Sequence, residues 1–361
     1  MKPDIYPNTY DLAEVFNNFL NRNSLNFFFQ EKGMFFLNAR QEEVAKELSK
    51  LFYDYEDLEQ LRKVAFENST SRSLSGFNLT SNDKFFNLKD LYERVRDVGH
   101  TETKGYSLHA LVKHETPTCS TYKGAIKYIK KKPGRIEFLQ EEERYTEFYI
   151  KDLSKGEWQI EVDGCKSSDG KEVLSLISTI TKYDRVEISS MDINALSIKD
   201  TIVFFDELAQ KGMDDNWRFS DTKQLTFRKR KNNSDIVDDE EVEEEKEAKE
   251  EQLSGITQAI LEGKNLRENP FVKQSEESGY IFTAMTYEYE HKKRPITIQL
   301  RAEFKGNPKI FEVSIVDYLE TEGLKAETKN LTIDSNSNRI IRSDFWNNAK
   351  NIYNNLSTIQ K

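Results

Sequence analysis

Residues 296–305 read Ile-Thr-Ile-Gln-Leu-Arg-Ala-Glu-Phe-Lys, and this stretch indicates the class of fold. Apolar and polar side chains alternate along it without a break. Successive side chains of a β-strand point to opposite faces of a sheet, so the alternation predicts a strand with one face in a core and one in water. Similar stretches at 280–290, 310–319 and 324–333 extend the prediction to an antiparallel meander.

A final helix is predicted after the meander. Residues 344–356 place Phe345, Ala349 and Ile352 on one stripe, and Ser343 is expected to be the N-cap. Helix, four strands and helix then follow one another in about a hundred residues, within the ordinary size of one domain. We therefore expect a separate C-terminal domain of helix, antiparallel meander and helix over residues 253–361.

The middle of the chain, residues 101–231, is predicted to be β-rich with two helices. The turn Lys132-Pro133-Gly134 is expected to join two of the strands as a hairpin. Asp200 is the expected N-cap of the second helix and Gly212 its end. The predicted strands are 106–114, 125–130, 135–142, 145–151 and 157–162, the helices are 172–181 and 200–211, and 217–231 is expected to be extended.

The first hundred residues are predicted to be mainly helical. Helices are expected at 10–20, 40–52, 56–67 and 87–98, where apolar residues recur at helical spacing. A hairpin is expected from 25–30 and 34–37 around Glu31-Lys32-Gly33, and a loop at 68–76. The predicted fold class is α+β, with a helical N-terminal region, a β-rich middle and the separate C-terminal domain.

An acidic connector is expected at residues 232–252. Eleven acidic residues and two lysines lie between Asp235 and Glu251, so this segment contributes −9 of the net charge of −10. Clustered like charges repel one another, which favours a solvated connector. A helix that continues into 253–261 and stops at Gly263 remains the other interpretation.

Composition argues for a cytoplasmic protein and against a membrane protein. No run of residues approaches the roughly 18–20 apolar residues that a spanning helix needs, and residues 1–10 lack the apolar core of a signal peptide. The chain has two cysteines, which fits a reducing compartment. The abundance of Asn, Lys, Ile, Phe and Tyr suggests an AT-rich genome, such as that of a bacterium, phage or mobile element.

Two motifs resemble ligand sites but fail on spacing. Five residues separate Gly164 from Gly170, where a phosphate loop has four, and Glu172 stands where that loop needs a hydroxyl. His109 and His114 are five apart, so on a strand they point to opposite faces and do not converge on a zinc ion. Neither cysteine has a local activating signature. We therefore expect no metal and no cofactor.

The strand at 296–305 carries the candidate catalytic residues, Glu303 and Lys305. A metal-dependent nuclease with a Glu-x-Lys pair needs both side chains on one face, the Glu to hold magnesium and the Lys to steady the attacking water or its charge. Any half-buried strand with a Glu two residues before a Lys meets this condition, so a solvated outer face is the expected interpretation. Nuclease chemistry also needs a carboxylate from a neighbouring strand, and the sequence does not select among Glu288, Glu290, Glu312 and Asp317.

Two basic clusters suggest contact with nucleic acid. Basic groups interleaved with aromatic rings suit phosphate contacts and base stacking. Acidic residues follow each cluster closely, so charge pairing within the protein is the alternative. The candidate nucleic-acid-binding residues are Lys127, Lys130, Lys131 and Lys132 in the first cluster and Arg228, Lys229, Arg230 and Lys231 in the second.

The expected function is that of a non-catalytic binding or assembly protein, with two α+β domains joined by the acidic connector. The expected partner is another protein or a second copy of this chain. The alternative is a nucleic-acid-binding or nucleic-acid-processing component of a bacterial antiviral defence or mobile-element system. Catalysis is left open. The two classes differ in salt dependence, because a protein that neutralises phosphates loses affinity steeply as salt rises.

Overall fold

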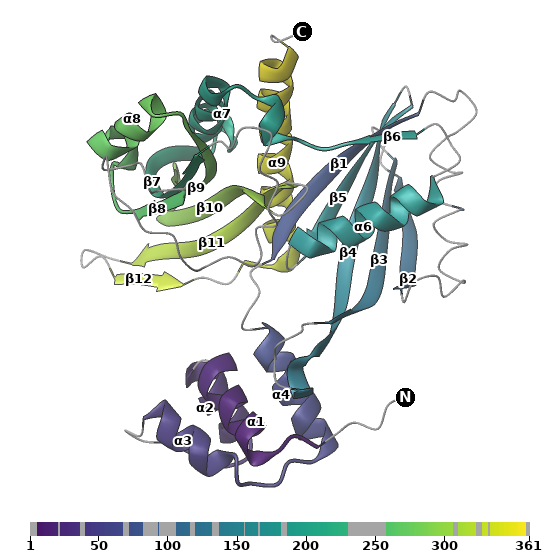
Figure 1. Ribbon diagram of the computed structural model, residues 1–361, viewed down its shortest axis with the longest axis vertical. Helices are drawn as coiled ribbons and strands as arrows, with labels where there is room; N and C mark the ends of the chain where they lie inside the picture. Colours follow the sequence, from purple (N-terminus) through teal and green to yellow (C-terminus); the bar gives the residue numbers. More distant parts are fainter. Residues whose placement is uncertain are drawn as a thin grey trace, which may run out of the picture. The chain divides into compact units, whose positions relative to one another are not determined.

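The computed structural model describes residues 6–20, 22–36, 40–67, 72–81, 93, 106–115, 120–131, 137–154, 156–164, 167–181, 186–229, 258–305, 310–322, 327–330 and 333–358. The chain forms two compact units, drawn in Figure 1. Unit 1 comprises residues 1–70, 102–107 and 126–145, and unit 2 comprises 71–101, 108–125 and 146–361. Helices and antiparallel strands both contribute, which confirms the α+β class.

Unit 1 is mainly helical, as predicted for the first hundred residues, and also contains the end of β3 (Ser120–Lys131) and the start of β4 (Glu141–Ser154). The predicted helices at 10–20, 40–52 and 56–67 are present, and the one at 87–98 lies outside the described residues apart from Glu93. Their apolar faces meet in one core that includes Leu12, Phe16 and Leu61. The elements are α1 (Thr9–Glu14), a π-helical turn (Val15–Phe19), α2 (Arg22–Gln30), α3 (Gln41–Leu48), α4 (Tyr55–Glu67) and the 3-10 turn η2 (Glu137–Leu139).

The hairpin predicted at 25–30 and 34–37 is wrong, because Arg22–Gln30 forms the helix α2. Leu25, Phe28 and Phe29 are buried, and their spacing of three and four residues places them on one helical face. The neighbouring Phe27 is exposed, so the aromatic run has two sides with different surroundings. Gly33 adopts a positive φ of 75° after the helix, a conformation that glycine accepts without steric cost.

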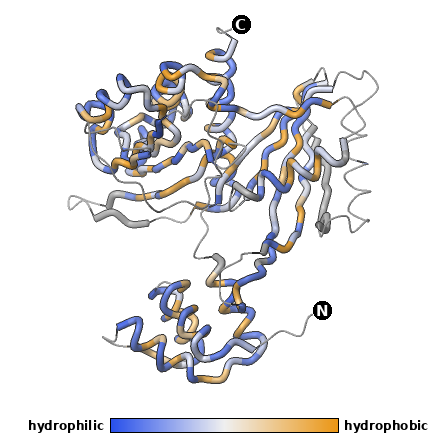
Figure 2. Tube along the Cα trace, in the orientation of Figure 1, coloured by the Kyte–Doolittle hydropathy of each residue, from blue (hydrophilic) through white to orange (hydrophobic). Residues whose placement is uncertain are grey.

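An antiparallel sheet runs in the order β2-β3-β4-β5-β1-β11-β10-β9-β7-β8, with β12 beside β11 and β6 beside β1. Figure 2 shows hydrophobic residues recurring along its strands. The strands are β1 (Ser73–Ser81), β2 (Tyr106–Glu115), β3 (Ser120–Lys131), β4 (Glu141–Ser154), β5 (Glu157–Gly164), β6 (Val186–Ser189), β7 (Trp217–Lys229), β8 (Gln258–Glu262), β9 (Tyr280–His291), β10 (Ile296–Lys305), β11 (Ile310–Glu322) and β12 (Glu327–Asn330).

β1 joins the two halves of this sheet, and the sequence did not reveal it. The loop predicted at 68–76 is wrong from Ser73 onward, since β1 pairs with β5 on one side and β11 on the other. A helix covers each face, so small residues are needed. A side chain at Gly76 would overlap the Trp346 indole of α9 (Ser335–Thr358), and a Cβ at Gly170 of α6 (Ser167–Ile180) would lie 2.6 Å from Ser75 Oγ.

Within the described residues the strand predictions are confirmed except at one place. Residues 135–142 do not form one strand, because Glu137–Leu139 is a 3-10 turn and β4 begins at Glu141. The predicted turn at 132–134 lies outside the described residues. The helix considered for 253–261 is wrong from Gln258 onward, because that residue begins β8.

The meander and the final helix are confirmed, with different helix starts. α9 begins at Ser335, where Asp334 Oδ1 accepts bonds from the Asn336 and Ser337 amides, so Ser343 is a buried mid-helix residue and not the N-cap. In α7 (Ile198–Lys211) the N-cap is Ser197 and not Asp200, and Gly212 ends the helix as predicted. The remaining helix of unit 2 is α8 (Pro270–Glu277).

The acidic connector at 232–252 lies outside the described residues, but the strands on either side of it pair with each other. Arg228 of β7 lies opposite Gln258 of β8, and β7 also pairs along β9. Residues 253–361 therefore share a sheet and a compact unit with residues 146–231, and the expected boundaries at 231 and 252 do not coincide with a unit boundary. In the part of the chain that is described, no helix is both long and apolar enough to cross a membrane.

This strand pairing changes what proteolysis of the connector is expected to yield. We expect the first cuts between about Lys229 and Gln252, with the two fragments still eluting together on a native size-exclusion column. The β7–β9 and β7–β8 ladders hold the fragments together, so denaturant is needed to separate them. Mass spectrometry of the eluted peak checks the result, and first cuts within 280–333 would contradict it.

Candidate functional site

Glu303 and Lys305 lie on one face of β10, as the alternation predicted. Glu303 lies opposite Glu312 of β11, and Arg301 Nε donates a hydrogen bond to Glu303 Oε2 at 2.8 Å. Lys305 is exposed. An ion-paired Glu on a partly exposed face agrees with the solvated-face interpretation, and the catalytic role of the pair stays a prediction.

Glu312 is the most buried of the four carboxylates among which the sequence did not select. Its exposed fraction is 7%, and its Oε1 has no hydrogen-bond partner in the described structure. Burial raises the pKa of Glu312 to about 7, with Lys305 opposing and Glu303 and Asp169 adding to the rise. Among the described residues, no three His, Cys, Asp or Glu side chains are arranged to hold a metal ion.

The two rejected motifs have structural explanations within the described residues. Gly164 ends β5, and Gly170 lies inside α6 against Ser75, so close packing accounts for Gly170. His109 and His114 both belong to β2.

Several described members of the basic clusters are paired within the protein. Lys127 forms an ion pair with Glu143, and Lys123 Nζ lies 2.8 Å from Glu147 Oε1, which is the charge pairing considered as the alternative. Arg228 Nη2 lies 3.5 Å from the Gln258 side chain, and Lys229 is the exposed last residue of β7. Lys132, Arg230 and Lys231 lie outside the described residues, as does the side chain of Lys131. Nucleic-acid contact stays a prediction.

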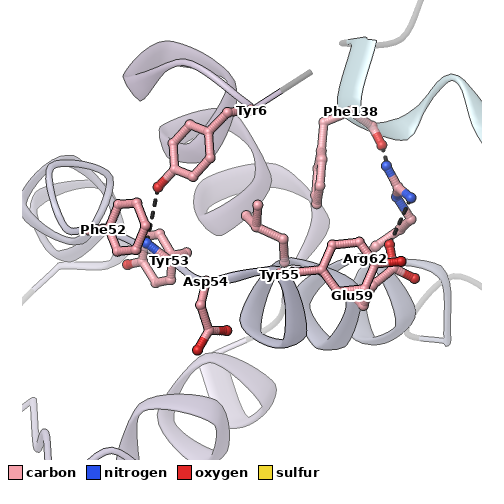
Figure 3. Close-up of a pocket in the computed structure, with 9 residues that line it drawn as sticks. Tyr6, Phe52, Tyr53, Asp54, Tyr55, Glu59, Arg62 and Phe138 are labelled. Atoms are coloured by element: carbon pink, nitrogen blue, oxygen red, sulfur yellow. Dashed lines mark hydrogen bonds and ion pairs between the residues drawn. The ribbon is translucent and has the colours of Figure 1, made fainter. Parts of the chain in front are cut away.

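The strongest candidate site is an aromatic pocket in unit 1 that the sequence analysis did not find. Its volume is about 290 Å³. Figure 3 shows Tyr6, Phe52 and Tyr53 on one side and Phe138, Arg62 and Glu59 on the other. The lining residues are Tyr6, Phe52, Tyr53, Asp54, Tyr55, Leu58, Glu59, Arg62 and Phe138. The run Phe52-Tyr53-Asp54-Tyr55 at the start of α4 was the available sequence signal.

Hydrogen bonds hold one wall of the pocket. Tyr53 is buried, and its hydroxyl donates to the Leu48 carbonyl at 2.7 Å. Burial raises the pKa of Tyr53 well above its ordinary range, so this donor stays protonated. The Tyr53 amide donates to Tyr6 Oη at 3.0 Å, and the Tyr6 ring stacks on Phe52 at 5.7 Å between centroids. The wall is therefore ordered before any ligand arrives.

Arg62 organises the opposite wall. Its guanidinium lies 4.8 Å from the Phe138 ring centroid, its Nε donates to the Phe138 carbonyl at 3.2 Å, and its Nη1 contacts Glu59 at 2.9 Å. The charges of Arg62 and Glu59 thus offset each other. An apolar group fits between these walls better than an ion, with the Tyr55 hydroxyl and the Arg62 guanidinium as polar groups at the wall.

Comparison with known proteins adds no family. No protein-family model matches the chain, and no curated protein matches it. Among solved structures, the chain has a weak similarity to DynU16, a protein from the dynemicin biosynthetic locus. It is 11% identical, the match covers 78% of this chain and 99% of that chain, and the TM-score is 0.15. A TM-score this low indicates neither a shared fold nor a shared function.

Proposed function

We propose that this protein is a binding or assembly protein whose unit 1 captures an apolar side chain of a partner protein in the aromatic pocket. The observation that carries this proposal is the exposure of the aromatic rim. Tyr6, Phe52 and Tyr55 are 47%, 81% and 63% exposed around a preformed cavity. Apolar groups that gather around a concave site are typical of interaction surfaces.

The energetics favour a protein side chain as the occupant. A buried aromatic ring removes roughly 150–250 Å² from water, and anchors in desolvated pockets dominate many interfaces. The Tyr6–Tyr53 hydrogen bond and the Arg62 contacts already fix much of the pocket, which lowers the entropy cost of binding. The partner is another protein or a second copy of this chain, and a cytoplasmic location belongs to the same proposal.

The pocket is tested by site-specific photo-crosslinking in the native cell, with a benzophenone amino acid at position 55 or at position 10. Tyr10 is the matched control, because it is a 73% exposed tyrosine of unit 1 outside the pocket. We expect one crosslinked protein of defined mass from position 55 and none of that mass from position 10. Equal capture from both positions would contradict the proposal.

Substitution gives the quantitative prediction. Phe52→Ala is expected to weaken the affinity for the captured partner at least about tenfold, which corresponds to about 1.4 kcal/mol. Tyr10→Ala is expected to change it less than about twofold. Circular dichroism checks that both variants keep their helices. An unchanged affinity in Phe52→Ala would remove the pocket from the interface.

A further inference from the structure

A cluster of charged side chains lies in unit 2, where α9 packs on the polar side chains of β4 and β5. Arg342 Nη1 lies 2.9 Å from Asp163 Oδ1, and Arg72 Nε approaches the same oxygen at 3.5 Å. Lys151 forms an ion pair with Glu161, and Arg339 Nη1 lies 3.9 Å from Glu161 Oε2. Three arginines and a lysine thus surround two carboxylates.

Tyr149 extends the cluster toward β3. The Arg339 guanidinium lies 4.3 Å from the Tyr149 ring centroid and Lys123 Nζ lies 5.6 Å from it. The Tyr149 hydroxyl donates to Glu147 at 2.9 Å, and Lys123 binds the other oxygen of Glu147 at 2.8 Å. Stacking on a ring fixes the plane of a guanidinium, which prepares it to bind a planar or tetrahedral anion.

The charges of this network do not balance. Among the described residues, the five cations Arg72, Lys123, Lys151, Arg339 and Arg342 share it with the four carboxylates Glu147, Glu161, Asp163 and Asp344, which leaves a surplus of one positive charge. Burial lowers the pKa of Arg342, Asp163 opposes that change, and Arg72 and Arg339 lower the pKa further. This response agrees with an excess of positive charge around Asp163.

The partly exposed members are the ones available to a ligand. Arg342 is buried and committed to Asp163, and the partly exposed Lys151 is held by Glu161 and by Ser343 Oγ. Arg72, Lys123 and Arg339 keep part of their side chains in solvent, although each also faces a carboxylate of the network. Lys123 and Arg339 lie over the Tyr149 ring, and Arg72 lies beside Asp163. Donors of this kind match the oxygen atoms of a phosphate group, which accept several charge-assisted hydrogen bonds at once.

We propose that Arg72, Lys123 and Arg339 form a binding site for a phosphate group in unit 2. The site is independent of the aromatic pocket, and of the first basic cluster it uses only Lys123. The ligand class is a phosphate ester or free phosphate. A nucleotide, a nucleic-acid end and inorganic phosphate share this chemistry, and the choice of probes distinguishes them.

The test measures binding of inorganic phosphate to the full chain by isothermal titration, with chloride at matched ionic strength as the reference. We expect saturable binding of phosphate to the wild type. In Arg339→Gln and in Lys123→Gln we expect the dissociation constant to be at least about tenfold higher. Arg218→Gln is the matched control, because Arg218 is an exposed, ion-paired arginine of unit 2 on β7. That variant is expected to bind phosphate as the wild type does.

Two further arms keep the result decisive. Arg339→Lys retains the charge and is expected to bind phosphate more strongly than Arg339→Gln, which separates a ligand role from a folding defect. Adenosine monophosphate and a 5′-phosphorylated single-stranded oligonucleotide are titrated in the same way to identify the source of the phosphate group. The ligand class is the one that binds more tightly than inorganic phosphate and loses this extra affinity in Arg339→Gln. No saturable binding by the wild type, or equal binding by Arg339→Gln, would overturn the proposal.

Discussion

Replacing Arg342 by methionine is expected to lower the free energy of unfolding of unit 2 by about 3–5 kcal/mol. Arg342 and Asp163 are both buried and joined at 2.9 Å, and Arg342 Nε also donates to Asn338 Oδ1 at 2.7 Å. Without the guanidinium, Asp163 keeps only the distant contact with Arg72 among these arginines. The free-energy cost of a buried carboxylate without a partner is much larger than the stabilisation that the intact pair contributes.

Urea unfolding followed by tryptophan fluorescence measures this loss. All three tryptophans, Trp158, Trp217 and Trp346, belong to unit 2, so the signal reports that unit alone. The double variant Asp163→Leu with Arg342→Met removes both charges and is expected to recover a large part of the lost stability. A loss below about 1 kcal/mol in Arg342→Met would show that the pair is solvated and contributes no more than a surface salt bridge.

Replacing Glu312 by glutamine is expected to remove a pH dependence of stability. The pKa of Glu312 is about 7 in the folded protein against 4.5 for an ordinary Glu, so the folded state holds this proton more tightly than the unfolded state. The stabilisation is complete below pH 4.5 and is lost as the pH rises to about 7. A shift of this size corresponds to a free energy on the order of 3 kcal/mol.

The measurement is the free energy of unfolding at pH 5 and pH 8 for the wild type and Glu312→Gln. The glutamine stays neutral, so the variant is expected to be more stable than the wild type at pH 8 and to show a smaller difference between the two pH values. Asp317→Asn is the matched control, because Asp317 is an exposed carboxylate of the same strand. A variant with the full wild-type pH dependence would refute the assignment to Glu312.

The position of Glu312 makes this titration structurally informative. It lies opposite Ser75 where β1 joins β11, and the described register between these strands consists of Ser73, Leu74 and Ser75 against Ser314, Val313 and Glu312. This short ladder connects the two halves of the sheet. A charge that appears at Glu312 is therefore expected to weaken the junction before it weakens the longer β10–β11 ladder.

The sequence by itself determined the elements whose pattern is local. The alternation at 296–305 specified β10 and its buried face, and helical spacing specified α4 and α7. These patterns suffice because each element buries one face, so its period shows directly in the order of residues.

Only the tertiary structure decided the rest. β1 carries Ser and Gly where a strand usually carries bulkier residues, because helices pack closely on both of its faces. The pocket combines Tyr6, Tyr53 and Phe138, and the charged cluster combines Arg72, Tyr149 and Arg339, in each case residues from distant parts of the chain. The sequence leaves such groupings open because strand order, register and the choice of helix partners are set by long-range packing, which no local period records.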